Sequence, residues 1–273
     1  MSLSTVLFLF LAHLGVGIIF TLVFVSKDAG VKFFRFNAGL AAILLVIALA
    51  FRYGVLGPTD ADPSRAGMYG LIALDCTAAA AIVYWATVGR MLASIRPVLV
   101  AVGVVGGVAA IVCEGIAVTT GRSAASQALT IASFLSSAAL LGGASTAMIL
   151  GHWYLVIPSM QVSHLQSIVK VHIASMVVRV VVVVAAVVVA IETWQPGLGP
   201  SFRHYITSVG GIFFWQRVLF GLGGPALLSY LTWETAKIRS TQSATGILYV
   251  DFFTVVVGEV LAKYLLLATR VPV

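Results

Sequence analysis

Acidic and basic side chains lie inside hydrophobic segments of this chain, where an isolated charge costs several kcal/mol. The segment VVVGEVLAKYLLLATR, residues 255–270, carries Glu259 and Lys263 in its interior. An acid followed four residues later by a base pairs well on one face of a helix. Such residues can bind a polar ligand and exchange protons with it, so they are the first candidates for chemistry.

More ionisable residues occur in the other hydrophobic segments: His13, Asp75, Glu114, His172, Arg179, Arg217 and Asp251. A helix rises about 1.5 Å per residue, so the depth of a residue follows from its distance to the end of its segment. By this count, six groups from five segments share the outer half of the membrane. They are His13, Asp75, Glu114, Arg217, Glu259 and Lys263.

This set of acids, bases and one histidine at similar depth can be interpreted in two ways. It could be a structural ion-pair network that fixes the register of the helices, because opposite charges tolerate burial together. It could also be a polar pocket for a ligand that exchanges protons. We favour the pocket, since intramembrane ionisable residues usually mark ligand or proton paths.

A second polar group lies toward the cytoplasmic side of the predicted membrane segments. The stretch GHWYLVIPSMQVSHLQSIVKVHI contains His152, His164 and His172. The spacings between these histidines match no standard metal-binding motif, so we predict no metal site. We expect instead an interfacial loop that contacts a soluble partner.

The composition indicates an integral membrane protein. Of the 273 residues, 60% are hydrophobic and 9% are charged, against about 25% charged in soluble domains. The net charge of +7 comes from basic residues spread singly along the chain. They form no basic stripe, so we expect no nucleic-acid partner.

Windows of about twenty apolar residues predict an all-α fold with eight transmembrane helices in one membrane domain, residues 1–273. The expected spans are 3–25, 34–55, 68–89, 96–119, 126–150, 168–191, 207–233 and 244–268. Eight spans could divide into two bundles of four helices. Small residues in the third and fifth spans, TAAAA and SSAALLGGASTA, predict that neighbouring helices approach these spans closely.

The lysines and arginines near the ends of the spans and between them predict the orientation in the cell (plasma) membrane. One side carries Lys27, Lys32, Arg35, Arg90, Arg96, Lys170, Lys237 and Arg239. The other side carries Arg52, Arg65, Arg122, Arg203 and Arg270. The richer side is expected in the cytoplasm, which puts both termini outside.

A b-type haem needs two axial ligands, usually histidines, that face each other at one depth. Only His13 lies well inside the outer half, whereas His152, His164 and His172 gather near the inner side. We therefore predict no haem.

The pattern of spans and two motifs resemble a known family. FWQRVLFGLGGPALLSYL in span seven and GEVLAKYLLL in span eight are similar to the membrane anchor subunits of DMSO reductase and polysulfide reductase type complexes. The resemblance implies a haem-free bundle of eight helices that binds a quinol, menaquinol or ubiquinol, near the outer face. It also implies two partners, an iron–sulfur subunit that exchanges electrons with the anchor and a molybdopterin catalytic subunit.

On this resemblance, Arg217 and Glu259 match the arginine and the acid of the family, and Lys263 stands where arginine is more usual. His13 would accept a proton from one quinol hydroxyl, and Asp75 or Glu114 from the other. Two alternatives stay open. The chain could be a proton-coupled transporter that uses the same carboxylates, or an accessory scaffold subunit of a respiratory or photosynthetic complex.

Overall fold

The chain is a membrane protein built only of helices within the part that the structure describes. The computed structural model describes residues 2–57, 64–90, 93–157, 161–193 and 201–273. Eight helical segments are long and apolar enough to cross a membrane, which confirms the predicted all-α class and span number. The α-helices are α1 (Leu3–Leu22), α2 (Gly30–Arg52), α3 (Arg65–Thr87), α4 (Arg96–Val118), α5 (Ala124–Val156), α6 (Val162–Glu192), α7 (Phe202–Thr207), α8 (Ile212–Val218), α9 (Gly224–Lys237) and α10 (Thr241–Thr269).

The predicted boundaries differ most at two helices. Helix α5 continues to Val156 and α6 begins at Val162, each six residues beyond the predicted span. Hydropathy finds the part of a helix that lies in hydrocarbon, but both helices continue past it into more polar sequence. Short 3₁₀ turns precede three of the helical segments: η1 (Lys27–Ala29), η2 (Ala93–Ile95) and η3 (Val209–Gly211).

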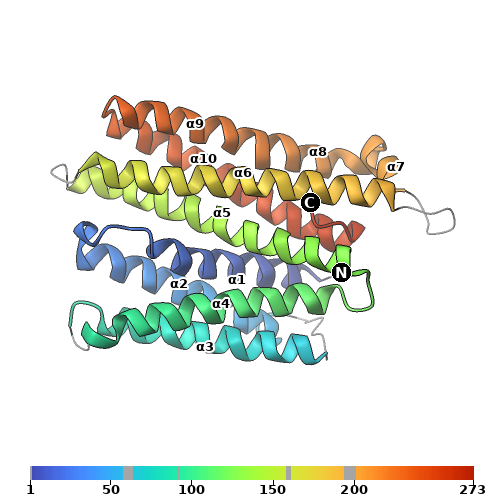
Figure 1. Cartoon of the computed structure of the whole chain (residues 1–273), viewed down its shortest axis with the longest axis horizontal. Helices are drawn as coiled ribbons and strands as arrows, with labels where there is room; N and C mark the ends of the chain where they lie inside the picture. The colour runs from blue at the N-terminus through green and yellow to red at the C-terminus, as the bar shows by residue number, and fades with distance from the viewer. Residues whose placement is uncertain (1, 58–63, 91–92, 158–160, 194–200) are drawn as a thin grey trace.

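Serines cap the helices that begin at one end of the bundle. We call this end, where α1 starts and α10 finishes, the termini end. The hydroxyls of Ser2, Ser64, Ser123 and Ser201 accept hydrogen bonds from backbone N–H groups in the first turns of α1, α3, α5 and α7. A helix leaves its first four N–H groups without backbone partners, and serine at the cap supplies an acceptor. Both ends of the chain lie toward this end of the bundle (Figure 1).

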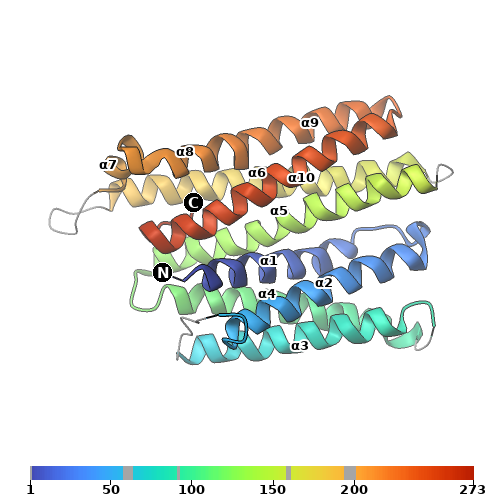
Figure 2. The ribbon, with the colours of Figure 1, turned by 180° about the vertical axis from the view of Figure 1, so that it is seen from behind.

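The helices pack in two sets along the chain. Helices α1 to α4 contact one another in order and α1 also contacts α4, while α5, α6, α9 and α10 form a second set of neighbours. Figure 2 shows the first set in blue to green and the second in yellow-green to red, with α1 and α5 side by side where the two sets meet. The contact between α1 and α5 joins the sets.

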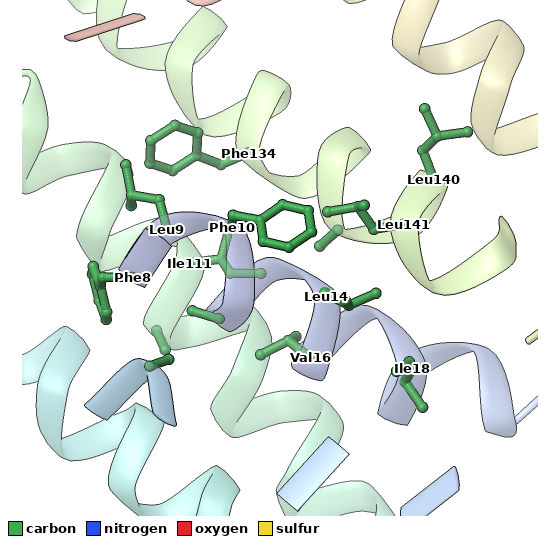
Figure 3. Close-up of a cluster of buried hydrophobic side chains, with 14 of the residues drawn as sticks. Phe8, Leu9, Phe10, Leu14, Val16, Ile18, Ile111, Phe134, Leu140 and Leu141 are labelled. Atoms are coloured by element: carbon green, nitrogen blue, oxygen red, sulfur yellow. The ribbon is translucent and has the colours of Figure 1, made fainter. Parts of the chain in front are cut away.

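The most buried helices are therefore α1 and α5, and glycines let them approach closely. A Cβ atom at Gly17 would lie 2.0 Å from the carbonyl oxygen of Ala138, and one at Gly142 would lie 2.1 Å from the oxygen of Gly17. The Thr21 hydroxyl also donates to the Gly142 carbonyl, at 3.2 Å. The predicted close approach at the fifth span is thus confirmed, and the apolar side chains of α1 pack against α4 and α5 around it (Figure 3).

The seventh membrane segment is interrupted by a π-helical turn, η4 (Leu219–Gly223), between α8 and α9. Pro225 follows the turn and has no N–H, so the carbonyl of Gly221 lacks its usual α-helical donor. That carbonyl accepts a hydrogen bond from Arg217 Nη1 instead, at 2.7 Å. The sequence LFGLGGP therefore both breaks the regular helix and orients Arg217.

Candidate functional site

Glu259 on α10 is the centre of a buried charged cluster. Its carboxylate accepts from Arg179 through Nε at 2.9 Å and Nη2 at 3.2 Å, which is a bidentate pair. Arg217 Nη2 donates to it at 2.8 Å, and Lys263 Nζ lies 3.5 Å away. The side chains of all four residues are at most 2% exposed. Charge-assisted bonds of this kind are the strong ones, and here they fill both carboxylate oxygens.

Two glycines bring Arg217 to Glu259. A Cβ atom at Gly258 would lie 2.2 Å from the Cα of Gly221, so α10 and the π turn are in backbone contact. Because Arg217 is held by the Gly221 carbonyl, this contact sets the guanidinium beside the carboxylate of Glu259.

Arg179 is the member of the cluster that the sequence analysis did not place with the others. Its Nη1 donates to the hydroxyl and carbonyl of Ser133 on α5, at 2.7 and 3.1 Å, and its Nη2 to the backbone oxygen of Val273, at 3.3 Å. Arg179 lies thirteen residues before the end of α6 at Glu192, about 20 Å along the helix. By the depth count this lies past the middle of a hydrocarbon core about 30 Å thick, so depth alone left Arg179 out of the outer group.

A polar chain continues from the cluster to α1. Lys263 Nζ donates to the Ser137 hydroxyl at 2.6 Å, and that hydroxyl lies 3.3 Å from His13 Nδ1. The other ring nitrogen, Nε2, is buried without a hydrogen-bond partner among the described residues. A cavity of about 20 Å³ beside His13 is also lined by Glu114. A space of this size holds one water molecule and is too small for the ring of an organic ligand.

The structure divides the six predicted site residues. His13, Arg217, Glu259 and Lys263 come together as expected. Glu114 belongs to the first helix set, where it lies 3.9 Å from Arg52 and faces His13 only across the small cavity.

Asp75 is separate from the cluster. It accepts a hydrogen bond from the Tyr53 hydroxyl at 2.7 Å. That hydrogen bond, together with partial desolvation and the nearby negative charge, raises the pKa of Tyr53 above its ordinary value. Asp75 has the right depth, but it lies on the side of α3 that faces α2, away from α10.

The three histidines expected in a partner-facing loop have different positions. His152 is exposed, with Nδ1 2.9 Å from the Tyr249 hydroxyl, and His164 Nε2 lies 3.1 Å from the carboxylate of Asp28. His172 does not face a partner. It is fully buried in α6, with Nε2 2.6 Å from Asp251 on α10. It does not belong to an exposed loop, because this position of α6 faces α10 inside the bundle.

The cluster contains three basic side chains and one acidic side chain. A buried charge is tolerated when it is paired, and among the described residues Glu259 is the acidic side chain that pairs with Arg179, Arg217 and Lys263. The arrangement therefore stabilises negative charge in the membrane interior, and further anionic or electron-rich atoms near it would be favoured.

A larger cavity opens at the termini end, close to this cluster. It has a volume of about 440 Å³ and mixed polar and apolar walls. It is lined by Arg122, Ser123, Ser126, Leu129, Ala186, Val189, Ala190, Thr193, Phe202, Thr269, Arg270, Val271 and Pro272. Residue Val273, next to this wall, accepts from Arg179. The cavity wall is thus linked to Glu259 through Val273 and the guanidinium of Arg179.

Arg122 and Arg270 make the cavity basic. Arg122 Nη1 donates to the backbone oxygen of Arg270 at 2.7 Å. Burial, followed by the charge of Arg270, lowers the pKa of Arg122. The sequence analysis counted both arginines only as orientation signals, and nothing in their spacing brings residues 122 and 270 together.

The described residues contain no group of three or more histidine, cysteine or acidic side chains that could hold a metal ion. Comparison with protein-family models and with curated protein sequences finds no match to this chain. The residues and their geometry therefore carry the functional argument.

Proposed function

We propose that this chain is the haem-free membrane subunit of a respiratory-type electron-transfer complex in the plasma membrane. In this proposal it binds quinol, menaquinol or ubiquinol, at the termini end, which faces outside. It exchanges electrons with an iron–sulfur subunit, and a molybdopterin catalytic subunit completes the complex. The observation that carries the proposal is the mixed polar and apolar cavity beside the buried Glu259 cluster.

The size and the lining of the cavity support the binding of a quinone head group. Ligand pockets usually have volumes of about 300–1,000 Å³ with a few placed polar groups on apolar walls, and this one has about 440 Å³. Guanidinium donors of Arg122 and Arg270 would hydrogen-bond the quinone oxygens. Leu129 and Phe202 would contact the ring.

Oxidation of one quinol releases two protons and two electrons. The electrons would pass to the iron–sulfur partner, and the protons need acceptors and a path to water. In the structure, Glu259 is already saturated by three cations. We therefore assign it the role of holding the cations in place. His13, whose Nε2 has no partner among the described residues, is the better proton carrier, with Glu114 across the small cavity as the next group.

A proton-coupled transporter is the second candidate, and the interruption of span seven beside buried charges favours it. Transporters usually have broken helices at corresponding positions in two halves. Here the interruption is a π turn whose free carbonyl is bonded by Arg217. This gives span seven a local role in orienting Arg217, so we rank the transporter second and a purely structural scaffold subunit third.

The proposal is tested by binding of short-chain ubiquinone and menaquinone analogues to the purified chain in lipid nanodiscs. Arg122→Gln removes a charged donor from the cavity, and such a bond contributes about 1.5–3 kcal/mol. We therefore expect a loss of analogue affinity of about tenfold or more. Arg65→Gln is the matched control, because Arg65 begins α3 at the same end of the bundle and is exposed.

Unchanged binding in Arg122→Gln, or an equal loss in Arg65→Gln, would contradict the assignment of the cavity. If neither analogue binds the chain at all, the quinol function fails as a whole. Proton-coupled uptake by liposomes that contain the chain alone would favour the transporter.

A further inference from the structure

A second surface feature lies at the opposite end of the bundle, between α2 and α3. It is an open groove with a volume of about 420 Å³. Its lining residues are Lys32, Arg35, Phe36, Gly39, Leu40 and Ile43 of α2 and Trp85 of α3. Both helices belong to the first set, whereas α10, which carries Glu259, belongs to the second (Figure 1).

The part of the groove nearest the start of α2 combines cations with an aromatic ring. The guanidinium of Arg35 lies 5.7 Å from the centroid of the Trp85 ring. Gly39 makes room for the indole, because a Cβ atom there would lie 2.9 Å from Trp85 Cδ1. Tryptophan and basic residues at the end of a membrane helix are typical of the level of lipid head groups.

The cations of the groove have no protein counter-charge among the described residues. Neither Lys32 nor Arg35 makes an ion pair there, and no acidic residue lines the groove. Asp28, on the turn before α2, is paired with His164 and Ser26. The groove is therefore open to an external anion.

The part of the groove further along α2, toward Ile43, is apolar and exposed. Phe36 is 54% exposed and Ile43 is 60% exposed, and they lie about two helical turns apart on α2. A small soluble anion would use the basic part and leave this apolar part uncovered. A molecule with both a phosphate and an alkyl chain would use both parts.

We propose that this groove is a binding site for an anionic phospholipid of the leaflet at that end. The phosphate lies between Lys32 and Arg35, and one acyl chain follows α2 past Gly39 to Ile43 beside Trp85. Basic pockets between transmembrane helices bind anionic head groups by this combination of charge and apolar surface. The site is independent of the quinol function.

The test is native mass spectrometry of the full chain, with retention of phosphatidylglycerol compared with phosphatidylcholine. Each basic residue near the head group contributes about fivefold to affinity, so Lys32→Gln/Arg35→Gln should lower the preference for phosphatidylglycerol roughly 25-fold. The matched control is Lys170→Gln/Lys237→Gln. These lysines lie 5.2 and 5.3 Å from the Trp233 ring, and Lys237 is already paired with Glu234.

A second variant tests the apolar part without changing charge. Ile43→Trp fills the groove at an exposed position and should release the lipid while both cations remain. Glycerol 3-phosphate, the head group without chains, should not compete. Equal losses in the two double variants would show general surface attraction and overturn the proposal, as would full retention in Ile43→Trp or competition by glycerol 3-phosphate.

Discussion

Replacement of Glu259 by glutamine tests whether the buried cluster is held by its single acid. The change keeps the size of the side chain and removes its charge. Arg179, Arg217 and Lys263 would then lie within bonding distance of a neutral amide, whose N–H groups face other donors. Leaving a buried charge without its partner costs about 3–5 kcal/mol. We therefore expect the free energy of unfolding to fall by about that amount.

The matched control is Glu234→Gln. Glu234 pairs with Lys237 at 2.6 Å, but both side chains are more than 40% exposed. A surface pair contributes about 0–1 kcal/mol, so the control should be nearly neutral. Reversible unfolding in mixed detergent micelles, followed by circular dichroism, measures both variants.

The excess of basic groups also predicts an asymmetry. Lys263→Met in the wild type removes one of three cations and leaves Glu259 paired with Arg179 and Arg217, so stability should change little. In the Glu259→Gln background the same substitution should restore about 1–2 kcal/mol, because it removes an unpaired charge. If Glu259→Gln is as stable as Glu234→Gln, the reasoning about this cluster is refuted.

Two further predictions concern packing and pH. Gly258→Ala should destabilise the chain by more than about 3 kcal/mol, because its Cβ would meet the Gly221 Cα at 2.2 Å; Gly246→Ala, on the same helix with no atom within 4 Å, should be neutral or stabilising in the same unfolding assay. Because the pKa of Tyr53 is raised in the folded state, its contribution to the free energy of unfolding is fully present below pH 10. This contribution is lost as the pH rises through the folded-state pKa. In Tyr53→Phe, the free energy of unfolding measured between pH 9 and 11.5 should lose this part of its pH dependence. The substitution also removes the hydrogen bond to Asp75, which costs about 1 kcal/mol. An unchanged pH profile would contradict the assignment.

The number of spans could be predicted from the sequence because lipid imposes one simple requirement on each segment. Every helix must be long and apolar enough to cross the membrane, and hydropathy measures this property directly. The close contact at Gly142 and the pairing of Glu259 with Lys263 were also accessible, because both depend on local sequence. The helix ends were less accurate, since α5 and α6 continue beyond the apolar stretches that hydropathy detects.

The candidate site could be predicted only in part because depth is one coordinate of three. Asp75 has a suitable depth but faces Tyr53, whereas Arg179 faces Glu259. Which face of a helix meets which neighbour depends on packing, here on the close contact of Gly221 with Gly258. The larger cavity is even harder to predict from the sequence, because residues from four helices and the tail after α10 form it.

Photolabelling of the purified chain in lipid bilayers with an azido-quinone, followed by peptide mapping, tests the central claim most directly. The account predicts that the label attaches to the cavity walls, in residues 122–129 and 269–272, and that excess unlabelled quinone prevents it. Labelling that is spread over lipid-facing helices, or that excess quinone does not reduce, would contradict a quinol site beside the Glu259 cluster.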